Sequence, residues 1–130
     1  MADDRFVIDA NVLIELASRD LLAEFAERMA APPFVRVETR SALHTDGVRT
    51  DTRACAREIQ ARIERASVEL LVDARQGDAA WGIADELGWT KTYDAEYLAA
   101  ARVHRLPIAT NDKRVQRAAA KLGIPLVTLP

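Results

Sequence analysis

Short apolar segments alternate along this chain with longer segments of helical periodicity, and this alternation is the strongest constraint on its fold. The apolar segments predict strands at residues 5–9, 68–72, 107–110 and 125–129. The periodic segments predict helices at residues 10–29, 34–44, 51–66, 76–87, 94–104 and 113–122. Parallel strands need long crossover connections, which are usually helices. We therefore expect an α/β fold with a short parallel β-sheet flanked by helices on both faces.

Proline, glycine and polar turn residues mark the boundaries between these elements. The first predicted helix has an internal cap and a bend at Asp20, and residues 31–33, Ala-Pro-Pro, end it. Residues 45–47, Thr-Asp-Gly, predict a turn after the second helix. Gly88 and Gly123 each follow a periodic segment, and we expect both to end their helices.

Length and composition indicate one globular domain. A chain of 130 residues can bury one compact core but not two, so we expect a single domain over residues 1–130. Cys55 is the only cysteine, which excludes an internal disulfide and favours a reducing compartment. Cys55 lies on an apolar helix stripe and is expected in the core. The chain has no apolar stretch of membrane-spanning length and no basic signal-peptide start, so we expect a cytoplasmic protein without membrane contact.

The charge is unevenly distributed. The net charge of −2 does not itself indicate a nucleic-acid-binding protein. However, residues 113–121 carry four basic residues and no acid. Arginine also outnumbers lysine in the chain, and its planar fork binds phosphate in a bidentate manner. A solvated helix face is the alternative explanation for each of these basic residues.

Three aspartates lie where predicted strands end or helices begin. Asp9 directly follows an apolar strand, Asp112 comes soon after another, and Asp94 opens a helix. Acids at the carboxyl ends of parallel strands point into the crevice where α/β folds bind ligands. Aspartate is also a favoured helix N-cap residue, so capping alone is the alternative explanation for each of the three.

A fourth acid, Glu38, has no capping explanation because it lies inside a predicted helix. Phe34 and Ala42, four residues away on either side, place its carboxylate on a face with apolar neighbours. A buried carboxylate without compensation is costly. Arg36 and Arg40 are two residues away and point elsewhere on the helix, so a metal ion is the simplest compensation.

The residue types favour a hard metal ion over other chemistry. Four carboxylates suit one or two Mg²⁺ or Mn²⁺ ions, which prefer oxygen ligands. His44 and His104 each lack a partner at ligand spacing, so zinc is not expected and both histidines are expected at or near the surface. The sequence shows no Ser-His-Asp or Cys-His arrangement, which disfavours a nucleophilic side chain.

Four blocks of this sequence resemble the motifs of PIN-domain ribonucleases, and most of all those of VapC-type toxins from bacterial toxin–antitoxin pairs. The blocks are residues 6–14, 33–38, 92–99 and 108–114. The last two blocks are the most specific. Residues 44–72 carry no matching motif and are expected to vary with partner and substrate.

The resemblance implies a set of site residues. The residues expected to be catalytic and to bind Mg²⁺ or Mn²⁺ are Asp9, Glu38, Asp94 and Asp112. Thr110 would hydrogen-bond within the site or orient the attacking water, and Asn11 would support the metal ligands. Asn111 departs from the family pattern, where a small residue is usual, and could contact substrate.

The resemblance also implies a function. The chain would hydrolyse phosphodiester bonds of single-stranded or looped RNA, with Lys113 and Arg114 holding the substrate backbone. Its expected partners are RNA, a small cognate antitoxin protein and a second copy of the chain in a homodimer. Trp81 and Trp89 could contribute to an apolar contact, although tryptophan more often packs in the core.

Two other classes of protein remain as alternatives. A haloacid-dehalogenase-like phosphatase also begins with a strand ending in aspartate, but it needs a second acid where this chain has Asn11. A non-catalytic module, such as a receiver domain or a PIN-like scaffold that binds RNA or protein, is the second. A receiver needs its acidic pair at the end of the first strand, whereas Asp3 and Asp4 precede that strand. The presence of all four acids favours an active enzyme.

Overall fold

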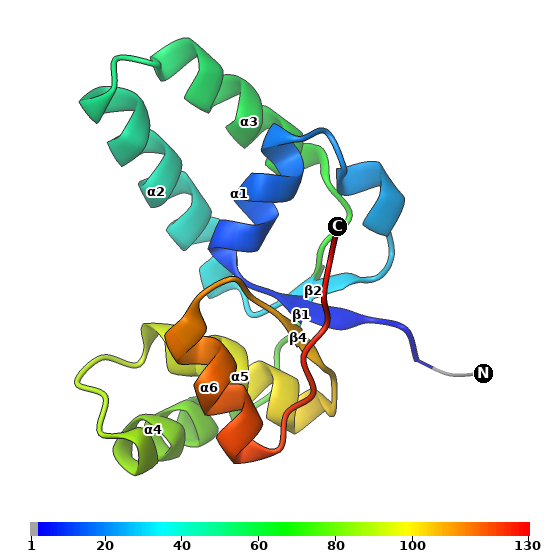
Figure 1. The fold of residues 1–130 in the computed structure, drawn as a ribbon, viewed down its shortest axis with the longest axis vertical. Helices are drawn as coiled ribbons and strands as arrows, with labels where there is room; N and C mark the ends of the chain where they lie inside the picture. The colour runs from blue at the N-terminus through cyan, green and yellow to red at the C-terminus, as the bar shows by residue number, and fades with distance from the viewer. Residues whose placement is uncertain (1–2) are drawn as a thin grey trace.

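The computed structural model describes residues 3–130, which form a parallel four-stranded sheet between two helical layers (Figure 1). The strands, in the spatial order β3-β2-β1-β4, are β1 (Phe6–Ile8), β2 (Met29–Ala31), β3 (Glu69–Leu70) and β4 (Ile108–Ala109). The helices are α1 (Ala10–Ser18), the short 3-10 helix η1 (Leu22–Phe25), α2 (Phe34–Arg49), α3 (Arg53–Arg65), α4 (Gln76–Leu87), α5 (Tyr93–His104) and α6 (Lys113–Leu122). Helices α1, α2 and α3 lie on one side of the sheet and α4, α5 and α6 on the other (Figure 1). The predicted α/β fold is confirmed.

The central strand β1 is buried because helices cover both of its faces. All three of its residues are at most 1% exposed, which explains its continuous run of apolar side chains. It pairs in parallel with β2 on one side and β4 on the other. The carboxyl ends of β1 and β4 therefore meet at the same edge of the sheet.

Glycines end two helices as predicted. Gly88 and Gly123 have φ angles of 69° and 73°, a left-handed conformation that glycine adopts without strain. After α4, the Gly88 N–H donates to Asp85 and the Trp89 N–H donates to Ala84. This pattern is a Schellman motif, and it fixes the direction in which the chain leaves the helix.

The predicted helix over residues 10–29 is wrong in its second half. Helix α1 ends at Ser18, and η1 and the strand β2 follow it. Asp20 and Glu27 adopt left-handed φ angles of 56° and 69°, which a continuous helix does not allow. The β2 segment, Met29–Ala31, has little intrinsic strand preference and forms a strand because it lies buried beside β1.

The predicted turn at residues 45–47 is also wrong, because α2 continues through it to Arg49. Gly47 is buried against α3, where an added Cβ would lie 2.9 Å from the Cβ of Ala56. The glycine therefore serves close helix packing rather than a turn. Helices α2 and α3 form a hairpin connected by residues 50–52.

Two further expectations are corrected. The predicted last strand, residues 125–129, makes only a single parallel bridge from Leu126 to Ile108. Cys55 is exposed rather than in the core, because the buried side of α3 is centred on Ile63.

The two tryptophans differ in burial. Trp81 is 69% exposed, so it does not follow the usual burial of tryptophan, whereas Trp89 is partly buried. Over residues 3–130 every helix is too short or too polar to span a bilayer.

Substitutions at two glycines should separate the packing role of Gly47 from ordinary helix propensity. Gly47→Ala places a Cβ against Ala56 and should lower the free energy of unfolding by about 1–3 kcal/mol, despite the better helix propensity of alanine. Gly82, inside α4, has nothing within 4 Å of an added Cβ, so Gly82→Ala should raise it by up to about 1 kcal/mol. Urea unfolding measures both changes, and equal stabilisation by both substitutions would contradict the packing role.

Candidate active site

Four elements bring the four predicted acids to one edge of the sheet. Asp9 directly follows β1, and Asp112 follows β4. Asp94 lies in the first turn of α5, and Glu38 lies near the start of α2. The charges of Asp94 and Asp112 act on Asp9, and the charges of Asp9 and Asp94 act on Glu38. Acids up to about a hundred positions apart in the sequence therefore influence one another in the fold.

Asp9 is the most buried of the four acids, with 9% of its surface exposed. Burial raises the pKa of its carboxyl group, hydrogen bonds with Thr110 and the Val12 N–H lower it, and the charges of Asp94 and Asp112 raise it. Oδ1 of Asp9 accepts the Val12 N–H at 2.9 Å and caps α1. Capping and membership of the acidic site are therefore two roles of the same carboxylate.

Glu38 is half-buried and is held by a residue that the sequence did not single out. The Tyr97 hydroxyl donates to Oε1 of Glu38 at 2.6 Å. Burial raises the pKa of Glu38, the Tyr97 hydrogen bond lowers it, and the charges of Asp94 and Asp9 raise it. Burial and the bond to Glu38 also raise the pKa of Tyr97, so its hydroxyl stays protonated and remains a donor. The available signal was spacing, since Tyr97 lies one turn after Asp94 on α5.

Asp94 pairs with Arg114 and does not cap its helix. Thr92 holds the N-cap position of α5, and no side chain accepts a capping hydrogen bond there. Nη2 of Arg114 instead donates to Oδ2 of Asp94 at 2.5 Å. The backbone N–H of Arg114 donates to Oδ1 of Asp112 at 2.8 Å, which together with a second bond from Val115 caps α6. Arg114 thus contacts two of the four acids.

The remaining predicted residues lie around this site in different environments. Thr110 is buried, and its hydroxyl accepts the Asp112 N–H at 3.2 Å. Asn111 donates to Glu15 at 2.5 Å. Asn11 is exposed in the first turn of α1, and Lys113 is exposed in the first turn of α6. Neither Asn11 nor Lys113 donates to the four acids within residues 3–130.

The donor set suits a hard divalent cation that keeps part of its water shell. All the donors are oxygens, and the charges of neighbouring acids raise the pKa values of Asp9 and Glu38, so a cation there would relieve repulsion. In the part of the chain that the structure describes, no three acids, histidines or cysteines converge closely enough to form a complete metal-binding group. Mg²⁺ commonly takes only one or two carboxylates with waters completing its shell, which these acids can supply.

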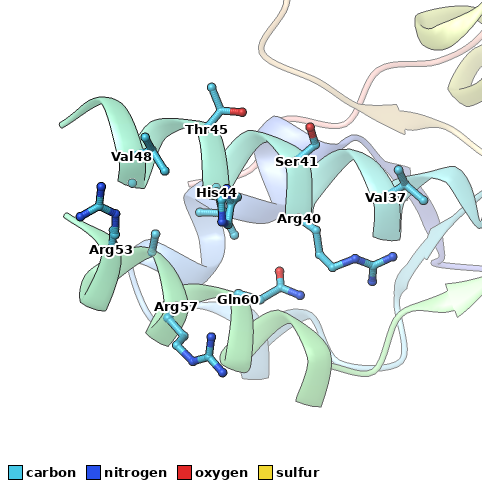
Figure 2. A pocket seen from close by; sticks show the side chains of 12 residues that line it. Val37, Arg40, Ser41, His44, Thr45, Val48, Arg53, Arg57 and Gln60 are labelled. Atoms are coloured by element: carbon cyan, nitrogen blue, oxygen red, sulfur yellow. The ribbon is translucent and has the colours of Figure 1, made fainter. Parts of the chain in front are cut away.

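The histidines take no part in this site. His44 is exposed on α2, and His104 shares a hydrogen bond of 2.7 Å with Gln76. A groove of about 690 Å³ also lies apart from the acids, between α2 and α3 (Figure 2). Val37, Arg40 and Gln60 are among its lining residues. The four acids do not line this groove, whereas Glu38 lines a separate shallow pocket with Ser41 and Arg49.

Comparison with known proteins identifies the family and the fold of this chain. The model of the PIN domain family matches residues 6–121. The chain belongs to the PIN domain family. The crystal structure of PAE2754 from Pyrobaculum aerophilum matches this fold with a TM-score of 0.72 and 24% sequence identity, covering 88% of this chain and 84% of that chain. None of the curated proteins matches the sequence. PIN domains are generally metal-dependent nucleases, which disfavours the phosphatase alternative.

The ionisation of Asp9 should destabilise the metal-free PIN domain. The pKa of Asp9 is raised in the fold, so this loss of stability is absent below the ordinary value of 3.8, grows as the pH rises above it, and is complete once the pH passes the folded value. Asp9→Asn removes the charge and keeps an N-cap acceptor. In EDTA, the D9N protein should have a higher free energy of unfolding than the wild type near neutral pH. This difference in free energy should become smaller on acidification.

Urea unfolding across the acidic to neutral range measures this difference. Asp85→Asn is a matched control, because Asp85 is exposed on α4 and is not among the charges that shift the pKa values of Asp9 and Glu38. A D9N protein that is less stable than the wild type near neutral pH would contradict the electrostatic account of the site.

Proposed function

We propose that this PIN domain is an endoribonuclease that hydrolyses RNA phosphodiester bonds with the help of Mg²⁺ or Mn²⁺. The supporting observation is the electrostatic coupling of acids from separate elements around the buried carboxylate of Asp9. A capping role explains two of these acids but neither Asp94 nor Glu38. A metal site for phosphodiester hydrolysis explains all four.

Each residue has a specific task in this proposal. One or two of Asp9, Asp94 and Asp112 would hold the ion directly, and the remaining acids, with Glu38, would bind its water ligands. A bound ion would lower the pKa of a water molecule and stabilise charge on the phosphoryl oxygens. Arg114 bonds Oδ2 of Asp94 and leaves Oδ1 free to coordinate.

Hydrogen bonds from the chain would keep these carboxylates in position. The Tyr97 hydroxyl fixes one oxygen of Glu38, and the Val12 N–H fixes one oxygen of Asp9. The Thr110 hydroxyl bonds to Asp9 and to the Asp112 N–H, and it would orient the attacking water. Such supporting bonds align metal ligands and hold them in their charged forms.

The proposed substrate is single-stranded or looped RNA. Lys113 is exposed one residue after Asp112 and would contact a substrate phosphate. Asp9 is nearly buried, so the scissile phosphate must come close to the sheet edge. An unpaired, bendable strand allows that approach more readily than a duplex does.

Cleavage of RNA by the purified chain tests the proposal. We expect cleavage with Mg²⁺ or Mn²⁺ and none in EDTA. Asp94→Asn removes a proposed ligand charge while leaving the helix cap at Thr92 in place, and should reduce the rate by roughly a hundredfold or more, the scale of losing a key electrostatic group. Asp85→Asn, the same change at an exposed site, should leave the rate unchanged.

Full activity of a folded D94N protein would contradict the assignment of the four acids. Metal-induced stabilisation against heat, measured on the same proteins, separates binding from chemistry. Stabilisation by Mg²⁺ without cleavage of any RNA would favour the non-catalytic binding module over the enzyme.

We further propose that the chain is the toxin of a toxin–antitoxin pair, held inactive by a small cognate antitoxin, and that it forms a homodimer. The support is the resemblance of residues 92–99 and 108–114 to the motifs of VapC-type toxins. Induced expression in bacterial cells should stop growth, whereas the D94N protein at the same level should not. Growth arrest by both proteins would show that toxicity does not depend on the acidic site.

A further inference from the structure

Arg114 lies over the ring of Trp89 beside the acidic site. Cζ of Arg114 lies 4.5 Å from the centroid of the Trp89 ring, within the range of a cation–π contact. The same guanidinium bonds Asp94. The pair therefore lies beside a proposed metal ligand, although Trp89 and Arg114 are 25 residues apart in the sequence.

Both members of the pair are positioned by the fold. The Schellman motif at Gly88 places Trp89, because the Trp89 N–H is bonded to Ala84 at 2.8 Å. Arg114 is anchored at two points, through its backbone N–H to Asp112 and through its guanidinium to Asp94. An arginine held at both ends loses little further conformational freedom when it binds a ligand.

The outer side of this pair is accessible. The Arg114 side chain is 54% exposed despite its bonds to protein, and Trp89 is only partly buried. Cζ of Arg114 lies over the indole ring while about half of the side chain stays exposed, so part of the guanidinium remains accessible to a planar ligand. Unpaired RNA bases stack on aromatic rings and on arginine planes in this way.

We propose that Trp89 and Arg114 form a stacking subsite for an unpaired RNA base next to the scissile phosphodiester bond. The inference rests on the proposed ribonuclease function and assigns these two residues to substrate positioning. Base stacking tolerates any base, so the subsite selects for an unpaired strand rather than for a sequence. Arg114 then contributes through its flat surface as well as its charge.

A binding experiment can separate stacking from attraction to phosphate. The protein carries Asp9→Asn to prevent cleavage, and two labelled oligoribonucleotides of equal length are compared by fluorescence anisotropy. One is an oligoadenylate, and the other has the same phosphates but no bases. We expect the base-bearing strand to bind roughly tenfold more tightly.

Three variants test the residues. Arg114→Lys keeps a positive charge that can still pair with Asp94, but it removes the planar guanidinium. The ratio of the dissociation constants of the abasic and base-bearing strands should therefore fall close to one. Trp89→Ala should do the same. Arg117→Ala is the matched control, because Arg117 is exposed on the same helix and its loss should weaken both strands alike without changing the preference.

Tryptophan fluorescence gives an independent readout of position. The chain has two tryptophans, and Trp81 is 69% exposed on α4, so Trp81→Phe leaves Trp89 as a single reporter. Its emission should change on adding the base-bearing strand but not the abasic one.

Equal binding of the two strands, or a preference unchanged in both R114K and W89A, would overturn the stacking subsite. Lack of binding by either strand would overturn it as well. Neither result decides the ribonuclease proposal, because the metal-dependent cleavage assay tests that separately. R114K leaves the Trp89 side chain in place, so it remains informative even if W89A disturbs the loop after α4.

Discussion

The buried carboxylate of Asp9 is the constraint on which the rest of the structure depends. It caps α1 directly after the central strand, and its pKa is raised because it is nearly buried and faces other acids. A fold tolerates such a group only when surrounding donors or a cation compensate it. The Val12 N–H and Thr110 supply part of that compensation. If the proposed cation binds, this arrangement gives up some stability of the empty domain for metal affinity, a compromise that is common at functional sites.

The sequence predicted the parts of the structure that depend on local residues. The parallel sheet between helices, the glycine ends of α4 and α6, and the positions of Asp9 and Asp112 at helix starts follow from periodicity and capping. The strand β2 could not be recognised, because Met29–Ala31 becomes a strand through its place beside β1. Gly47 was misassigned for a related reason, since its role depends on a helix that follows it in the chain.

The candidate site shows the same division between local and long-range information. The four acids could be singled out because each is anomalous or well placed in its own segment. Their partners could not, because Tyr97 meets Glu38 and Arg114 meets Asp94 only after distant helices pack together. Capping and metal binding were treated as competing explanations for Asp9 and Asp112. In the fold, the cap fixes the orientation of each carboxylate, so capping is compatible with the proposed metal-binding role.

The close contact at Gly47 has a mechanical consequence for the acidic site. Helix α2 carries Glu38 near its start and Gly47 nine residues later, about 14 Å along the axis at 1.5 Å per residue. A helix moves nearly as a rigid body. A tilt of α2 at its contact with α3 would therefore displace Glu38 by an amount that grows with this distance along the axis. The contact between Gly47 and Ala56 therefore affects the position of the Glu38 carboxylate through α2, although neither residue touches Glu38. The α2–α3 hairpin, which carries no family motif beyond Glu38, is thus mechanically linked to the acidic edge of the sheet.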